Sequence, residues 1–207
     1  MLYEHWSFSR WNCQSAKPRE TDLRAVVNAI LYMAVSSLDG LQTVGVAHAP
    51  SPVHKMGFLI KPSIRMPAYV MTSDRVLLAA KSDDEATSML RKMDRQPFTK
   101  ATLTSIGTLM QAIRKVQEVG FAAIEEELEV GLLSLAVAIR NRRGDTVASL
   151  NVSSDTPTTT LTEFCDVALP VMRMTAREIG AILFQEADQR PPNEVCELRP
   201  LISLSIS

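Results

Sequence analysis

The chain has few of the residues that mark secreted, metal-binding or membrane proteins. Its 207 residues include three cysteines, Cys13, Cys165 and Cys196. This odd number, without a C-x-x-C spacing, argues against a disulfide framework and against a zinc site. No apolar run reaches the roughly 18 residues of a membrane-spanning helix, and the amino-terminal residues mix charged and aromatic side chains, unlike a signal peptide. We therefore expect a soluble, cytoplasmic protein with reduced thiols.

The chain also lacks an excess of charge of either sign. It has 22 Lys and Arg residues against 23 Asp and Glu residues, a formal net charge of -1. A surface that neutralises a phosphate backbone needs a basic excess, so we expect the chain by itself to bind DNA poorly. Its hydrophobic content of 46% and its length allow one good-sized core. We expect one domain.

The first half of the chain predicts a helix, a hairpin and more helices. Residues 1–21 have no usable period, and we interpret them as a tail or linker remnant. From Asp22, apolar residues fall at helical spacing, and the sequence then becomes strand-like to Leu38. Asp39-Gly40 between two strand-like runs predicts a hairpin, because both turn positions need positive φ. Further elements are expected as a third strand at Val53–Ile60, a loop with a short helix at Met66–Ala80, and a helix from Ser82 to Gln96.

The second half has clearer helix and strand signals. Thr102–Val119 carries an apolar stripe, and Gly120 follows it where a left-handed carboxyl-terminal cap belongs. Two strands are expected over Leu133–Asn141 and Thr146–Ser153. Thr160 and Glu163 have capping-box spacing at the start of a long helix, in which Pro170 predicts a bend.

This order of elements predicts an α+β fold, an antiparallel sheet flanked by helices. Three segments are expected: a tail or linker remnant at 1–21, one domain at 22–186, and a polar, Pro-rich, mobile tail at 187–207.

Four motifs occur in the order found in a known family. They are Leu38-Asp39-Gly40, the MPAYVMTSDRVLLA segment from Met66 to Ala79, the Phe98-Thr99-x-x-Thr102-Leu103 run, and a signature of Gly120, Glu127, Ser134, Ala136, Ile139 and Asn141. In this order they resemble the effector-binding domain of the IclR family of bacterial transcription regulators. The run from Gly120 to Ser153 resembles the branch that controls protocatechuate and 4-hydroxybenzoate catabolism. Ile124 and Asp74 depart from residues common in the family.

The resemblance implies a GAF-like or profilin-like domain that senses a small organic acid and controls DNA binding. It also implies a homodimer or homotetramer, no membrane association, no cofactor and no catalytic activity. Family members carry a winged helix-turn-helix before this domain, and only about twenty residues precede Asp22 here. We therefore expect a sensor without its DNA-binding domain. A free-standing GAF-like sensor that acts through a protein partner remains an alternative.

The resemblance also implies a set of ligand-binding residues, namely Phe58, Met66, Thr72, Ser73, Ile124, Leu132, Ser134, Asn151 and Ser153. An organic acid in a mostly apolar cavity needs only a few convergent donors. Loop N–H groups at Thr72 and Ser73, with hydroxyls at Ser134 and Ser153, are suitable carboxylate donors, and Asn151 suits a hydroxyl or carbonyl group. Taken alone, the two serines are also typical of ordinary strand residues, and Phe58 and Met66 of a core.

Other polar clusters have simpler interpretations. The acidic run Glu125–Glu129 is typical of a solvated bend rather than a catalytic or metal site. His48 and His54 have no third ligand at metal spacing. The arginines at 140, 142 and 143 fit either an anion site or a solvated hairpin end. An enzyme acting on a small acid is the rival hypothesis, with Glu127 and Asn151 as its only plausible acid-base pair.

Overall fold

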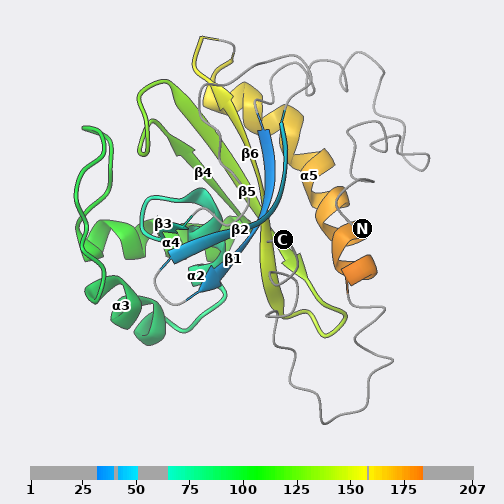
Figure 1. Ribbon diagram of the computed structural model, residues 1–207, viewed down its shortest axis with the longest axis horizontal. Helices are drawn as coiled ribbons and strands as arrows, with labels where there is room; N and C mark the ends of the chain where they lie inside the picture. The colour runs from blue at the N-terminus through cyan, green and yellow to red at the C-terminus, as the bar shows by residue number, and fades with distance from the viewer. Residues whose placement is uncertain (1–31, 40–41, 51–64, 158, 184–207) are drawn as a thin grey trace, which may run out of the picture.

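A six-stranded antiparallel sheet organises the chain (Figure 1), in the order β3-β2-β1-β6-β5-β4. The computed structural model describes the backbone of residues 32–39, 42–50, 65–157 and 159–183, and the side chains of 66–157 and 159–181. Within these residues the predicted α+β architecture is confirmed.

The first hairpin has the predicted topology. β1 (Tyr32–Asp39) and β2 (Gln42–Pro50) pair antiparallel, from Asp39 opposite Gln42 to Tyr32 opposite Pro50. The turn at 40–41, the expected helix from Asp22 and the expected strand at 53–60, with Phe58, lie outside the described residues. β3 (Arg65–Pro67) is a short edge strand on β2.

The second hairpin is also where the sequence predicts it. β5 (Leu132–Arg140) and β6 (Thr146–Asp155) pair along their length, and β6 joins the first hairpin by pairing with β1. The strand β4 (Phe121–Glu125), which pairs with β5, was not predicted. It is only five residues long and merges into the acidic run, so its alternation of burial is hard to recognise in the sequence.

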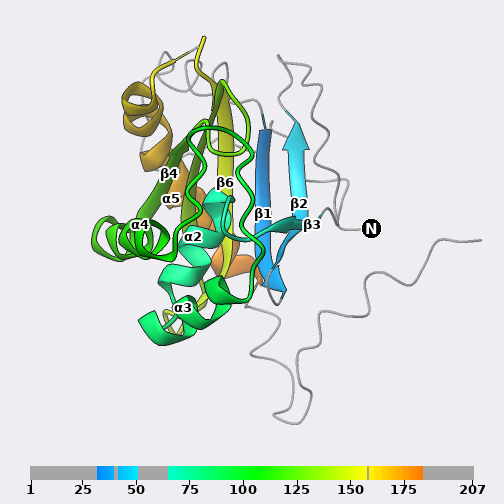
Figure 2. The same ribbon diagram turned by 90° about the vertical axis from the view of Figure 1, so that its left-hand side faces the viewer.

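Helices cover both faces of the sheet (Figure 2). α2 (Thr72–Ala79) and α4 (Ile106–Val119) lie on one face, with α3 (Asp83–Arg91) beside α4. α5 (Leu161–Leu183) packs on the other face, mainly against β5, and continues through Pro170. None of the helices in the described part of the chain is both long and apolar enough to cross a membrane.

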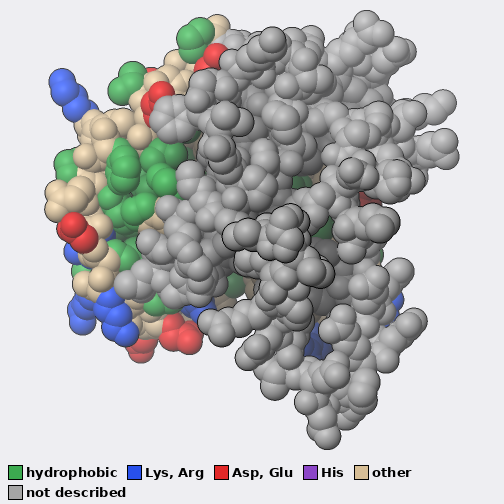
Figure 3. Space-filling view, in the orientation of Figure 1, with side chains coloured by type: hydrophobic (Ala, Val, Ile, Leu, Met, Phe, Trp, Pro, Cys, Tyr) green, Lys and Arg blue, Asp and Glu red, His purple; other side chains and the backbone are tan. Residues whose placement is uncertain are grey.

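Local side-chain contacts explain where the helices begin and end. Ser82 and Glu85 form a capping box at α3, and Gly120, with φ of 78°, ends α4 as predicted. α4 begins after Ser105 rather than at Thr102, because the Thr102 hydroxyl donates instead to the carbonyl oxygen of Glu127 at 2.6 Å. α3 ends at Arg91, well before Gln96. At this end of the helix the Arg95 guanidinium donates to the carbonyl oxygens of Leu90 and Met93. Charged side chains gather over α3 on the face shown in Figure 3.

The core has two main parts, one on each face of the sheet. Alternate residues of β5 and β6 pack against the apolar face of α5, around Phe164 and Met172. A second cluster joins α3 and α4 to the segment before α2, around Tyr69 and Leu90. Both faces of β5 and β6 are therefore buried, which explains the nearly continuous burial of these strands.

Candidate functional site

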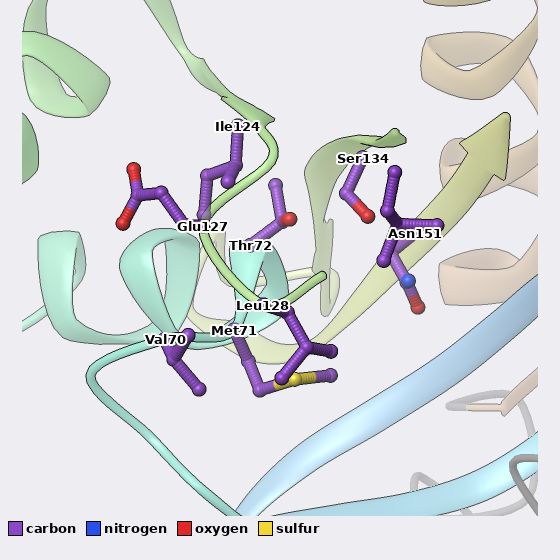
Figure 4. A pocket seen from close by; sticks show the side chains of 9 residues that line it. Val70, Met71, Thr72, Ile124, Glu127, Leu128, Ser134 and Asn151 are labelled. Carbon is purple, nitrogen blue, oxygen red and sulfur yellow. The ribbon is translucent and has the colours of Figure 1, made fainter. Parts of the chain in front are cut away.

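A small cavity lies between the amino-terminal end of α2, the bend after β4, and strands β5 and β6 (Figure 4). Its volume is about 10 Å³, which is about the space that one water needs. The lining is mostly apolar and comprises Val70, Met71, Thr72, Ile124, Glu127, Leu128, Leu132, Ser134 and Asn151. The polar side chains among these come from four separate places, namely α2, the bend after β4, β5 and β6.

Five of the residues expected in the site line this cavity, namely Thr72, Ile124, Leu132, Ser134 and Asn151. Three others do not line it. Met66 is half-buried against the second core cluster, Ser73 is fully buried in α2, and Ser153 contacts Ser134. Phe58 is outside the described residues.

The polar wall of the cavity is formed by neighbouring strands. Ser134 on β5 lies opposite Ser153 on β6, and their Oγ atoms are 2.8 Å apart. Asn151 lies two residues before Ser153, so both side chains project from the same face of β6. All three residues are buried. Ser153 does not line the cavity. Its hydrogen bond with Ser134 fixes the position of the Ser134 hydroxyl, and Ser134 does line the cavity.

The expectation that Thr72 and Ser73 belong to a loop is wrong. They are the first two residues of α2, and Met71 is its N-cap residue. The N–H groups of Asp74 and Arg75 already donate to the Met71 carbonyl oxygen. The N–H groups of the first helical residues have no acceptor within a helix, and here no side chain of the N-cap residue supplies one. This end of α2 is therefore suited to an anion.

The interpretation of the acidic run as a solvated face is wrong for Glu127. Its side chain is buried, and its Oε2 atom lies 2.5 Å from Nη2 of Arg75 on α2. The N–H of Leu103 donates to the same oxygen at 3.3 Å. Burial without these partners would disfavour the carboxylate strongly. In Figure 4 the carboxylate points away from Ser134 and Asn151, so Glu127 and Asn151 do not form an acid-base pair.

Four lining residues were not in the expected ligand-binding set: Val70, Met71, Glu127 and Leu128. Of these, only Glu127 is named in the rival enzyme hypothesis. Val70 and Met71 lie directly before Thr72. Because Thr72 was expected in the pocket, its neighbours in the chain could have been expected to line it too. Leu128 is the one apolar residue among the glutamates of the acidic run, and an isolated leucine there is a sign of an inward turn. Among the described residues, no group of three metal-ligating side chains is present.

The sequence pattern of one family matches most of the chain. The family is described as bacterial transcriptional regulator IclR C-terminal, and the match covers residues 14–181. The Pca operon regulatory protein of Acinetobacter baylyi is 30% identical over 158 residues, which is 74% of this chain and 56% of that protein. The chain spans about half the length of the curated relatives it matches.

Solved structures agree in fold. A Rhodococcus sp. RHA1 structure described as a transcriptional regulator is 35% identical, with a TM-score of 0.71, over 80% of this chain and 66% of that one. The inducer-binding domain of the PobR transcription factor from Acinetobacter, a double mutant in complex with 3-hydroxybenzoic acid, is 26% identical. Its TM-score is 0.67, over 72% of this chain and 87% of that one.

The family match and the similarity to solved structures lead to one conclusion. The chain belongs to the IclR family of bacterial transcriptional regulators, and it contains the C-terminal, effector-binding domain of that family.

Proposed function

We propose that this domain senses a small aromatic carboxylic acid. The observation that supports this most directly is the amino-terminal end of α2, which meets Ser134 and Asn151 across a mostly apolar cavity. An apolar wall with a few convergent polar groups is typical of small-molecule sites. The similarity to a PobR domain in complex with 3-hydroxybenzoic acid supports an aromatic acid in particular.

The ligand carboxylate would lie at the start of α2. There the Thr72 and Ser73 N–H groups and the Thr72 hydroxyl can donate to it, and the helix dipole favours the negative charge. The ring would pack on Ile124 and Leu132, and a ring hydroxyl would meet Ser134 or Asn151. Asp74 is buried in the same first turn. Because its own carboxylate would repel that of the ligand, the ligand carboxylate is confined to the side of α2 that faces the cavity.

Binding requires the cavity to expand, because an aromatic acid does not fit in about 10 Å³. Met71 and Leu128 are the most adaptable walls, since Leu128 is only partly buried and methionine side chains adjust easily. Their movement would shift the acidic bend relative to α2. A ligand that favours the expanded arrangement shifts the population of the domain toward it.

In the intact regulator this shift would change DNA binding by a helix-turn-helix domain, through a homodimer or a dimer of dimers. We propose that residues 22–186 form the sensing domain, that it acts in the cytoplasm, and that it is not an enzyme. The position of Glu127 supports the last point, since Arg75 engages the one carboxylate that lines the cavity among the residues that the structure describes. Light scattering after size-exclusion chromatography, with and without ligand, tests the oligomeric state.

A thermal-shift screen tests the ligand class. The purified chain is heated with 3-hydroxybenzoate, 4-hydroxybenzoate, protocatechuate, β-ketoadipate, pyruvate and glyoxylate. A ligand that binds only the folded state raises the Tm, by an amount corresponding to about 2.7 kcal/mol at a concentration 100 times the Kd. We expect the shift with one or more of the aromatic acids.

Variants then place the ligand. Asn151→Asp adds a negative charge to the cavity and is expected to abolish the shift, while Ser134→Ala is expected to reduce it. Ser88→Ala, on the exposed surface of α3, is the matched control and should leave the shift unchanged. A shift with a keto acid alone would contradict the aromatic class, and a shift that survives Asn151→Asp would contradict the site.

A further inference from the structure

A second hollow lies at one end of the sheet, between the carboxyl-terminal half of α5, the end of β5 and the turn into β6. Figure 1 shows where α5 and β5 lie in the fold. Its volume is about 590 Å³, within the range of small-molecule sites. Ser134 in the first cavity and Arg140 in this hollow are six residues apart on β5, about 20 Å along a strand. The two sites are therefore separate.

Four arginines line the hollow: Arg140, Arg142, Arg173 and Arg177. We call it the arginine groove. In the part of the chain that the structure describes, no Asp or Glu lines it. The nearby Asp145 accepts from the Asn141 side chain at 2.9 Å and pairs with Arg143, which lies outside the lining, at 3.3 Å. Four like charges around one hollow create a positive potential that attracts an anion.

Two of these guanidinium groups are held in place by the backbone. Arg140 Nη1 donates to the Gly144 carbonyl oxygen at 2.9 Å. Arg173 Nη2 donates to the Val119 carbonyl oxygen at 3.2 Å, and its guanidinium carbon lies 5.9 Å from the centroid of the Phe121 ring. Each contact uses one of the five N–H donors of a guanidinium. The remaining donors can therefore bind an anion with a smaller loss of side-chain conformational entropy, because these two side chains are already ordered.

The packing of α5 brings the arginines of different elements together. Arg173 and Arg177 are four residues apart and therefore lie on one face of α5. Close to them, Gly180 lies so near β5 that an added Cβ atom would be 2.3 Å from the Arg140 carbonyl oxygen. Because glycine allows this approach, the helix arginines and Arg140 share one groove. Small residues such as Ala138 and Ala176 leave room between them.

We propose that the arginine groove binds a small polyanion, a phosphorylated or polycarboxylate metabolite with two or more negative charges. Arginine forks bind phosphate and carboxylate groups through paired hydrogen bonds, so both anions share the required chemistry. Four arginines suit a higher charge than the single carboxylate proposed for the first cavity. This site is independent of the proposed sensing function, and either can fail without the other.

Calorimetry of the full chain with pyrophosphate, citrate and acetate, at constant ionic strength, tests the site. We expect saturable binding of pyrophosphate or citrate with a submillimolar Kd, and none of acetate. Pyrophosphate alone would identify a phosphate ligand, and citrate alone a polycarboxylate. Arg173→Gln/Arg177→Gln should weaken binding by at least about tenfold, because two charge-assisted contacts are lost. Arg177→Gln alone, at an exposed residue, keeps the test valid should the double variant fail to fold.

Arg91→Gln/Lys92→Gln at the exposed end of α3 is the matched control, and we expect less than about a twofold change in Kd for this loss of the same charge. Glycine amides locate the ligand by NMR, with expected shifts at Gly120, Gly144 and Gly180, which all line the groove. The proposal is overturned by absence of saturable binding, by equal weakening in the control, or by shifts confined to the start of α2. Binding of duplex DNA without binding of the small anions would also overturn it.

Discussion

Arg75 on α2 and Glu127 in the bend after β4 form a buried ion pair, with 2.5 Å between Nη2 and Oε2. The same bend is held by the hydroxyl groups of Thr99 and Thr102, which donate to the carbonyl oxygens of Glu126 and Glu127, each at 2.6 Å. The pair thus ties the helix that begins at the cavity to the bend that closes it. This electrostatic contact therefore helps to set the spacing between the two walls.

Removing one partner of this pair should destabilise the domain strongly. Glu127→Ala leaves the Arg75 guanidinium buried without its counter-charge, and we expect the free energy of unfolding to fall by about 3–5 kcal/mol. Urea denaturation measures it. Arg114→Gln removes one partner of an exposed pair with Asp83, and should cost less than about 1 kcal/mol. Similar losses in both variants would argue against a structural role specific to the buried pair.

Replacing both partners by apolar residues should cost less than removing one. In Arg75→Met/Glu127→Leu no buried charge is left alone, so we expect most of the stability lost in Glu127→Ala to return. Ligand binding would still suffer, because the bend loses its fixed distance from α2. Thermal-shift measurements on the double variant separate these two effects, and a double variant less stable than Glu127→Ala would contradict the expectation.

Gly180 and Gly107 should respond to alanine in opposite directions. At Gly180 an added Cβ atom meets the Arg140 carbonyl oxygen at 2.3 Å, whereas at Gly107 it meets nothing within 4 Å. Both glycines are helical. We expect Gly180→Ala to destabilise the domain, because the backbone must shift, and Gly107→Ala to stabilise it by up to about 1 kcal/mol. Denaturant midpoints of the two variants compare them directly.

The features that sequence predicts well here depend on neighbours in the chain. The start of α3 at Ser82, the pairing of Thr160 with Glu163, and the left-handed Gly120 are all set within a few residues. The burial of Glu127 is set by Arg75, 52 residues earlier, so the acidic run by itself gave the wrong environment. Thr102 likewise bonds across 25 residues to the bend instead of starting α4.

The same distinction applies to the candidate site. Ser134 and Asn151 both line the cavity, since strand alternation fixes their faces. Met71 and Leu128 line it because of how α2 meets the bend, so their positions in the chain give only an indirect signal. The arginine groove has a similar origin. The sequence shows the turn arginines, but Arg173 and Arg177 join them only through the packing of α5 on β5.

Gly120 should tolerate asparagine better than alanine. Its φ of 78° lies in the left-handed region, and no atom would be within 4 Å of an added Cβ atom, so the cost of substitution comes from the backbone alone. We expect Gly120→Ala to cost about 1 kcal/mol and Gly120→Asn less, because asparagine adopts this conformation more readily. Thermal unfolding of both variants measures the difference. Equal losses would indicate that the cap is not the source of the cost.

The capping boxes should make stability depend on pH in the acid range. The pKa of Glu163 lies below its usual value of 4.5, because the N–H and hydroxyl groups of Thr160 donate to the carboxylate, and Ser82 does the same for Glu85. A lowered pKa in the folded state means that the unfolded state binds more protons between the two pKa values. The stabilisation is complete above the unfolded pKa and is lost as pH falls through the folded pKa.

Unfolding of the wild type and of Glu163→Gln, followed at about pH 6 and about pH 3, checks this sign. The wild type should be the more stable at the higher pH, and the difference should shrink at the lower one, because protonation of its carboxylate removes the stabilisation. Glu85→Gln should behave in the same way at α3, and the double variant should lose both contributions, because the two helix starts are separate. A difference that does not change with pH would show that the charge of these carboxylates does not stabilise the helix starts.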